Sequence, residues 1–306
     1  QPLLNQYDDE IDLRELFAVL WAGKLKIIAI TAIFAVASVI YALSIPNQYK
    51  ATALLAPAQS DGGGLSGALG QLGGLASLAG VSLGGGESGE AQIAQEIMKS
   101  WSYIEGFIAD NNIAGEVYAA EGWSKESNTL QINNEAYDVK ANKWLLEDES
   151  GAIKPPSSWQ LFQAFSGMLS VSEDKKSGLV SVSIEYYSPQ IAKQWVDMYV
   201  QSINRFMQQR QIDKVTRNIN YLQEQIEKTS IAQMQEVFYT IIEEQTKNKM
   251  LAEASPEYAF VVVGPSMVPE LKSQPKRALI CILGALLGGM LSVLMVLIMH
   301  YAKKSD

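Results

Sequence analysis

The sequence predicts an α+β membrane protein in which two membrane-spanning helices flank one domain, made of an α/β base and a long protruding helical hairpin. Two apolar runs, residues 27–45 and 278–299, are each long enough to cross the roughly 30 Å hydrocarbon core as a helix. Between them, residues 180–187 alternate apolar and polar side chains as a strand does. Residues 189 to about 228 hold a helical pattern without Gly or further Pro. Strands and helices in separate stretches are typical of the α+β class.

The two spans predict the membrane topology. Both chain termini lie on one side of the membrane, and residues 46–277 lie on the other. Basic residues flank the spans at both ends, so the charge balance is close. Short tails with lysines nonetheless favour cytoplasmic termini: Lys24, Lys26, Lys303 and Lys304. We therefore expect residues 1–26 and 300–306 in the cytoplasm and the domain outside it. Cleavage of the first run as a signal peptide is the alternative, but signal-peptide apolar regions are shorter and only a weak cleavage site follows.

The N-terminal segment carries apolar side chains at helical spacing: Leu13, Leu16, Phe17, Leu20 and Trp21. Acidic residues precede them, where a helix N-terminus favours negative charge. The pattern predicts an amphipathic helix within residues 1–26. Contact with a cytoplasmic partner is one interpretation, and a helix that lies at the membrane interface beside the first span is the favoured one.

After the first span, residues 47–57 are predicted to form a short strand that ends at Pro57. Residues 61–89 are then rich in glycine and nearly uncharged, yet they repeat apolar residues: Leu65, Leu69, Leu72, Leu75 and Leu78. A polar flexible linker lacks this repeat. Two interpretations remain open, a loop that packs into a neighbouring subunit or lines an oligomeric cavity, and a disordered insertion whose glycines are costly to order. No P-loop pattern occurs, so a phosphate-binding role is not expected.

The next elements belong to the base of the domain. One helix is predicted with a single apolar face, ended by Asn111 and Asn112: Ile93, Ile97, Trp101, Ile104 and Ile108. Residues 114–156 have no periodicity and are left unassigned. A helix with a serine cap follows and runs into a strand, which pairs as a hairpin with the strand at 180–187, whose one face is buried and the other wet. The β-rich run before Pro265 is predicted to join the same sheet.

The helical hairpin is predicted over residues 189–252. Ser188 and Pro189 fit the N-cap and first positions of a helix that reaches about Lys228, on the order of 60 Å at 1.5 Å per residue. Ser230 and Gln233 match a capping box that would begin the return helix. Because such a helix exceeds what a compact domain needs, we expect the hairpin to project and to pack against itself or against other chains.

Catalytic and metal-binding chemistry finds little support. The sole histidine, His300, and the sole cysteine, Cys281, lie in or at the end of the second span, so they cannot build a catalytic triad or a Cys/His metal site. Three groups of neighbouring acids are interpreted as solvated surface: Glu147/Asp148/Glu149, Glu173/Asp174 and Glu243/Glu244. A formal charge of -9 disfavours nucleic acid as a partner. We expect no cofactor, no metal and no nucleic acid.

The second span carries a helix-packing motif. Gly284, Gly288 and Gly289 form G-x-x-x-G with one further glycine, a pattern that lets helices approach closely. Small residues of the first span, at Thr31/Ala35 and Ser38/Ala42, are candidates to meet it. The pattern leaves open whether the two faces meet within one chain or between chains.

Four stretches occur in order along the chain: "DDEIDLRELFAVLWAGK" before the first span, "YKATALLAP" after it, "SGLVSVSIEYYSP" before the long helix and "PSMVPELKSQPKRALI" before the second span. Together they resemble the Wzz-type polysaccharide chain-length determinants, the short class of polysaccharide co-polymerases without a kinase domain. The similarity extends over nearly the whole chain. The glycine- and leucine-rich segment is not part of every member, and the resemblance assigns it no role.

The resemblance implies a bacterial inner-membrane protein with a periplasmic domain, assembled as a homo-oligomeric ring. Such rings set the length of the lipopolysaccharide O-antigen made by a separate membrane polymerase, and lipid-linked polysaccharide is a further candidate partner. The family has no known catalytic residues, so we expect no enzyme activity. Its proline-rich segment falls on residues 264–277, at Pro265, Pro269 and Pro275, where prolines keep the chain extended.

Two other functions are weighed against this one. The first is a co-polymerase or export component for capsule or exopolysaccharide that works with a separate tyrosine kinase. We expect no built-in kinase, since the sequence has no Walker motif. The second is a two-span sensor, which is disfavoured because no output domain is expected beside either span.

Overall fold

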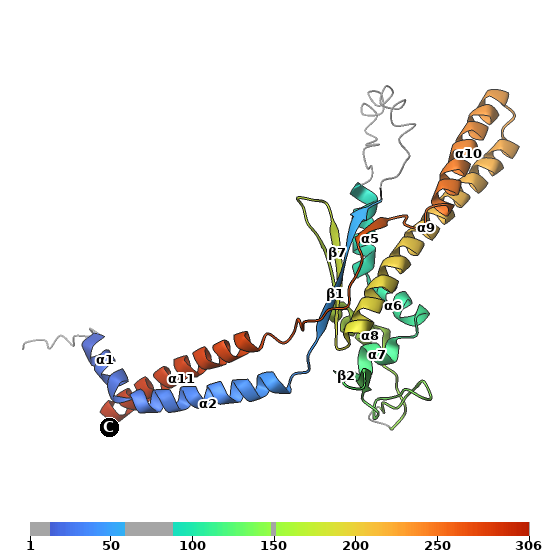
Figure 1. The fold of residues 1–306 in the computed structure, drawn as a ribbon. Helices are drawn as coiled ribbons and strands as arrows, with labels where there is room; N and C mark the ends of the chain where they lie inside the picture. The colour runs from blue at the N-terminus through green and yellow to red at the C-terminus, as the bar shows by residue number, and fades with distance from the viewer. Residues whose placement is uncertain (1–12, 59–87, 148–150, 306) are drawn as a thin grey trace, which may run out of the picture. The chain divides into compact units, whose positions relative to one another are not determined.

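The computed structural model describes residues 13–58, 88–147 and 151–305. They belong to two compact units, one from Gln1–Asn47 with Ser273–Asp306 and one from Gln48–Lys272. The first holds two helices that are long and apolar enough to cross a membrane, and the second holds mixed helices and strands with one very long helix (Figure 1). The predicted α+β class is confirmed, with one candidate membrane helix before the domain in the sequence and one after it.

The first unit, called the membrane unit below, has three helices in its described residues: α1 (Leu13–Ala22), α2 (Lys24–Ser44) and α11 (Arg277–Ser305). The apolar parts of α2 and α11 have mean hydropathies of 2.4 and 2.6. They lie side by side along their length (Figure 1). Their outward side chains are mostly apolar and exposed, which is the pattern of helices that face lipid.

A four-stranded sheet forms the base of the domain. Its order is β6 (Leu169–Glu173), β7 (Val180–Tyr186), β1 (Tyr49–Pro57) and β8 (Phe260–Gly264), and every neighbouring pair is antiparallel. Ala53 pairs with Val182, and Val171 pairs with the same residue from the other side. Strands from both ends of the domain therefore share one sheet, as the sequence predicts.

The core lies between this sheet and the first half of α9 (Pro189–Lys228). Val182, Ile184, Trp195 and Tyr199 are all buried there. Helices α6 (Trp101–Asp110) and α8 (Ser158–Met168) contribute to the same core, and Ser157 caps α8 with the predicted serine. The predicted wet face of β7 is wrong at Ser183, which is buried. Its hydroxyl lies 2.9 Å from that of Thr52 on β1, so the buried polar group has a hydrogen-bond partner.

The single helix predicted through residues 93–108 is wrong. The structure has two helices, α5 (Ser88–Lys99) and α6, which break at Ser100 because its hydroxyl accepts from Tyr103 N as an N-cap. The break turns part of the predicted apolar face outward, so that Ile93 and Trp101 are exposed while Ile104 stays buried. A serine inside an apolar pattern was the signal for this break.

The unassigned stretch forms several short elements beside the base. They are α7 (Ala114–Ala119), β2 (Ala120–Ser124), β3 (Thr129–Ile132), β4 (Tyr137–Asp138) and β5 (Lys143–Trp144). They form two hairpins around a small second cluster of Ala119, Ala136 and Tyr137. Elements this short have too few residues for a periodic pattern to be read from sequence.

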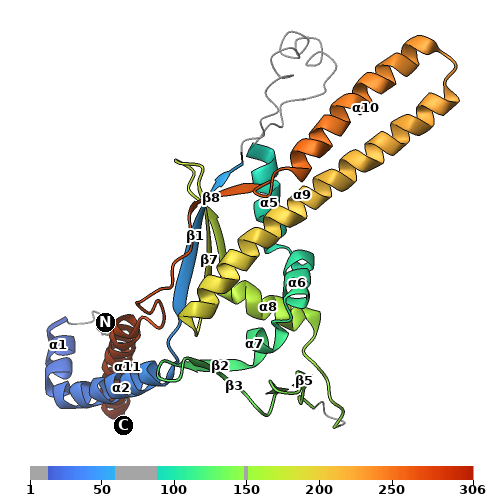
Figure 2. The same ribbon diagram turned by 45° about the vertical axis from the view of Figure 1, so that its right-hand side comes forward.

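The helical hairpin consists of α9 and α10 (Ala232–Glu253) and extends away from the sheet (Figure 2). Ser188 caps α9 as predicted. The predicted capping box of Ser230 and Gln233 is wrong, because α10 begins after Ile231, which makes no side-chain cap. The Gln235 amide instead donates to the carbonyls of Ile226 and Thr229 and closes the turn from inside.

Candidate functional site

Among the described residues, no group of three or more His, Cys, Asp or Glu side chains is placed to hold a metal ion. Glu173 accepts from the Gln95 amide at 3.0 Å. Asp174 accepts from Lys176 N in the β6–β7 turn, and this bond lowers the pKa of its carboxyl. Both acids of this pair therefore serve local structure.

Three buried tyrosines in the described part of the domain have strongly raised pKa values. Burial raises the pKa of Tyr103, Tyr186 and Tyr199 far above the usual value, so their hydroxyls remain protonated donors. Tyr199 donates to the carbonyl of Met98, and Tyr186 donates to the carbonyl of Glu116 at 2.7 Å. Each hydroxyl thus satisfies a backbone group between elements of the core, which is a structural role.

The predicted glycines of the second span face the first span within one chain. A methyl group at Gly284 would lie 2.4 Å from Ser38 Cβ, and one at Gly288 would lie 2.5 Å from Phe34 Cβ. Only glycine allows the two backbones to come this close. Gly289 is different, since a methyl group there would meet Thr31 Oγ1 at an ordinary 3.9 Å.

Polar contacts connect the same two helices. The hydroxyls of Thr31 and Ser292 lie 3.4 Å apart, and Ser292 is fully buried. At the other end of the pair, Arg277 Nε donates to Ala42 O at 3.0 Å, and its Nη2 donates to Asn47 Oδ1 at 3.1 Å. These contacts define the register between α2 and α11.

The proline-rich segment runs from the end of β8 to the start of α11. Pro265 and Pro269 belong to the domain and Pro275 to the membrane unit, where the Gln274–Pro275 bond is cis. Apart from one isolated bridge at Gln274, the segment between β8 and α11 has no helix or strand. The three prolines thus lie where the chain passes from one unit to the other.

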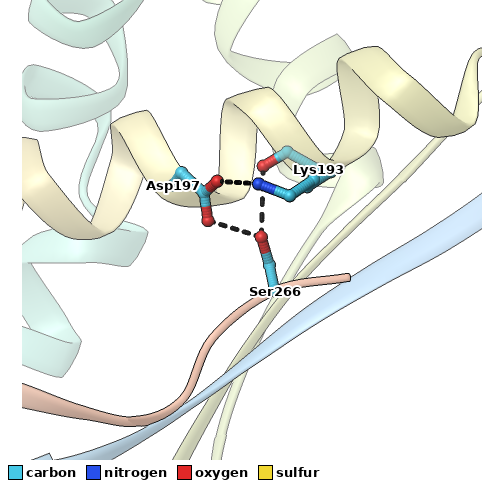
Figure 3. A network of polar contacts seen from close by, with 3 residues as sticks. All are labelled: Lys193, Asp197 and Ser266. Carbon is cyan, nitrogen blue, oxygen red and sulfur yellow. Dashed lines mark hydrogen bonds and ion pairs between the residues drawn. The ribbon is translucent and has the colours of Figure 1, made fainter. Parts of the chain in front are cut away.

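A polar network fastens the start of this segment to α9 (Figure 3). Ser266, which is buried, donates its hydroxyl to Asp197 on α9. Asp197 is also paired with Lys193, one helical turn earlier, at 2.5 Å. The segment that leads to the second span is therefore held to the helix that forms the hairpin.

The hairpin exposes apolar side chains near its tip. On α10, Met234, Val237 and Ile241 recur at helical spacing and are 46%, 56% and 37% exposed. Beyond Met207, Val215 is the only α9 residue that is fully buried. The outer part of the hairpin thus packs chiefly along one seam and leaves apolar surface uncovered. The predicted contact leucines, Leu65 to Leu78, lie outside the described residues.

Residues 9–110 match the family model of the Wzz chain length determinant protein. Over these residues the chain is similar to the Wzz chain length determinants. The predicted resemblance is thereby confirmed for the first membrane helix, β1 and the first helices of the base, α5 and α6. A search of curated protein sequences returns no match.

Two solved structures are similar to the chain over most of its length. The first is described as a full-length bacterial polysaccharide co-polymerase, with 15% identity, a TM-score of 0.40 and coverage of 96% of this chain and 99% of that one. The second is a fragment of the polysaccharide co-polymerase WzzB from Salmonella Typhimurium, with 12% identity, a TM-score of 0.29 and coverage of 74% and 100%.

Sequence reasoning missed several residues that organise the region outside the Wzz match. The buried amide of Asn204 on α9 donates to Phe260 O and accepts from the backbone nitrogens of Ala259 and Phe260, at 2.8 to 2.9 Å. Gln208 donates to Ala252 O at 2.8 Å, at the end of α10. One sequence signal could have found them. They are amide side chains within the apolar stripe of a long helix, where burying an amide without a hydrogen-bond partner costs free energy.

Proposed function

We propose that this protein is a non-enzymatic regulator of lipopolysaccharide O-antigen chain length that works with a separate polymerase in the bacterial inner membrane. The match of residues 9–110 to the chain length determinant model carries the proposal. The two candidate membrane helices support it, because they anchor the domain in the membrane where a lipid-linked glycan is made. Lipid-linked polysaccharide is the further partner of this proposal.

The proposed orientation places the domain, residues 46–277, in the periplasm and both termini in the cytoplasm. Support comes from the short lysine-bearing tails that flank the spans. A single cysteine introduced at the tip of the hairpin should react with a membrane-impermeant thiol reagent on intact spheroplasts. Labelling only after the membrane is broken would reverse the orientation.

A non-catalytic mode of action fits the polar groups of the domain. The tyrosines with the most altered pKa values are committed to backbone carbonyls of the core. Regulation would then depend on how copies of the chain assemble and how they present the hairpin and membrane helices to the polymerase.

Assembly into a homo-oligomeric ring is the second part of the proposal. The uncovered apolar side chains of α10 support it, since apolar surface of this kind is usually buried in a contact. Residues 61–89, with Leu65 to Leu78, are proposed to line a subunit contact or an internal cavity. Light scattering of the detergent-solubilised chain should give several times the 33.5 kDa chain mass, and a monomer mass would contradict the ring.

The proline-rich segment is proposed to transmit the position of the domain to the second span. Pro265, Pro269 and Pro275 keep the connection extended, and the packing of Gly284 and Gly288 holds its far end. Replacing all three prolines by alanine should shift or broaden glycan length while membrane insertion stays normal. An unchanged length distribution at normal expression would refute this role.

The regulatory function itself can be tested by gain of function. The chain is expressed in a bacterium that makes O-antigen of unregulated length because its own regulator has been deleted. A ladder that becomes concentrated around one length supports the proposal, whereas an unchanged ladder beside inserted protein opposes it. If capsule or exopolysaccharide length changes instead, the chain serves that polymer together with a separate kinase.

A further inference from the structure

Helix α1 leaves two large aromatic side chains uncovered within the membrane unit. Phe17 and Trp21 are 66% and 64% exposed, although both belong to a helix whose other side is packed. Their rings stack with centroids 6.3 Å apart and an interplanar angle of 21°. The only charged residues in the helix are Arg14 and Glu15, both in its first turn. The half of α1 closest to the span is therefore wholly apolar.

The position of α1 in this unit is fixed at Gly23. Gly23 N donates to Val19 O at 2.9 Å, and Ile27 N donates to Gly23 O at 3.1 Å, so hydrogen bonds continue through the bend into α2. A methyl group at Gly23 would lie 2.6 Å from a methyl carbon of Val296 on α11. Val19 is buried in the same place. One side of α1 is thus held against the end of the two-helix pair (Figure 1).

The exposed side continues into the surface of the first span. After Trp21, the next large apolar side chains that are exposed are Leu25 and Ile28, at 76% and 62%. They lie at the start of a helix that is apolar enough to cross a membrane. Lys24, at the boundary, holds its amino group 4.7 Å from the centre of the Trp21 ring. Its charge is therefore placed beside the indole, where the apolar part of the helix begins.

This chemistry fits the boundary between lipid headgroups and acyl chains. Tryptophan is enriched at that depth because its ring is apolar and its N–H is polar, and lysine stems extend along apolar surface while the amino group reaches water. We propose that α1 lies in the interface of the membrane that α2 and α11 span, with Phe17 and Trp21 inserted as anchors and Lys24 at the headgroups. The lipid surface, and neither a second copy nor a soluble protein, covers this face.

The proposal rests on the membrane anchoring of the chain and is independent of its role in glycan length. Trp21 is a suitable reporter, because the other five of the six tryptophans lie between residues 101 and 195, in the other unit. The full chain and its Trp21→Phe variant are reconstituted into phosphatidylcholine vesicles. The difference between their emission spectra gives the signal of Trp21 alone.

Two sets of quenchers then locate the indole. Bromine on the acyl chain close to the headgroup should remove most of the difference signal, bromine near the bilayer centre should remove less, and aqueous acrylamide should remove little. Full quenching by acrylamide with none by brominated lipid would overturn the proposal. Protection from both quenchers would also overturn it, because another protein surface would then cover the ring.

A second variant guards against a local effect of the substitution. Phe17→Trp in the Trp21→Phe background moves the reporter by one helical turn along the same face. The same order of quenching by the two brominated lipids is expected. If acrylamide quenches this reporter and neither brominated lipid does, α1 turns away from the bilayer and the proposal is overturned.

Discussion

Asn204 offers the sharpest test of how the base of the domain is held together. Its side chain makes three hydrogen bonds to the backbone at the start of β8, and the residue is 4% exposed. β8 is the last strand before the proline-rich segment, so this amide fixes the strand from which the chain leaves the sheet. Asn204→Ala deletes the carboxamide and with it all three bonds.

The magnitude follows from the groups that the substitution leaves behind. Each hydrogen bond contributes about 1 kcal/mol net, and each buried backbone group left without a partner costs about 1–3 kcal/mol. The variant leaves Phe260 O and the nitrogens of Ala259 and Phe260 without this partner. We expect the free energy of unfolding of the domain to fall by roughly 3–5 kcal/mol, a large value for one substitution.

Urea unfolding of the detergent-solubilised chain, followed by tryptophan fluorescence, measures this loss. Five of the six tryptophans lie in the domain, so the signal reports on that unit. Asn220→Ala, an exposed asparagine on the same helix, is the matched control and should stay within about 0.5 kcal/mol. A loss below about 1 kcal/mol for Asn204→Ala would refute the reasoning, since the three bonds would then contribute no more than a typical single one.

Three further predictions address the other contacts. Gly288→Val should push α2 away from α11 and lower the thermal stability of the membrane unit, because overpacking costs about 1–3 kcal/mol. Gly289→Ala, the control, should have little effect on that stability. Equal thermal unfolding midpoints for the two variants would contradict the close packing at Gly288. Above pH 10 the free energy of unfolding should fall by up to about 1.4 kcal/mol per pH unit for each buried tyrosine, because Tyr186 and Tyr199 stay protonated in the folded state while the unfolded chain releases their protons. Tyr199→Phe should make the fall of the unfolding free energy with pH shallower. A urea unfolding midpoint of the unmodified chain that stays the same from pH 9 to 11 would contradict the prediction. Ser266→Ala should speed amide hydrogen exchange in the segment after β8 through the lost bond to α9, and unchanged exchange would show that the network does not hold the segment.

The parts of the fold that could be predicted from sequence are those set by long patterns. The α9 helix begins at Pro189 and ends at Lys228 as expected, because a serine cap and 39 residues without Gly or further Pro leave few alternatives. The alternation of Val180, Val182 and Ile184 likewise fixed the buried face of β7. The strand before Pro265 was placed correctly in the sheet from its composition alone.

The errors occurred where one side chain decides between two local structures. Ser100 could continue a helix or cap a new one, and the tertiary packing of α6 selected the cap. Ser230 matched a capping box, but the Gln235 amide satisfied the turn instead. The two local structures differ in free energy by about 1 kcal/mol, and the burial of a few apolar side chains contributes more than that.

The candidate site could be predicted only where a short sequence motif indicates the contact directly. The glycine pattern of the second span indicated close packing, and the structure places Gly284 and Gly288 against the first span. The amide of Asn204 and the hydroxyl of Ser266 gave no comparable signal, because their partners are backbone and side-chain groups more than 50 positions away in the chain. Long-range polar contacts of this kind follow from the tertiary fold and not from local spacing.

The most direct test of chain-length regulation is the O-antigen ladder of the native bacterium. The gene is deleted and then restored on a plasmid, and the extracted lipopolysaccharide of the three strains is compared on one gel, with capsule size measured in parallel. The account predicts that the preferred length disappears on deletion and returns on restoration. A ladder that stays the same in all three strains would contradict it.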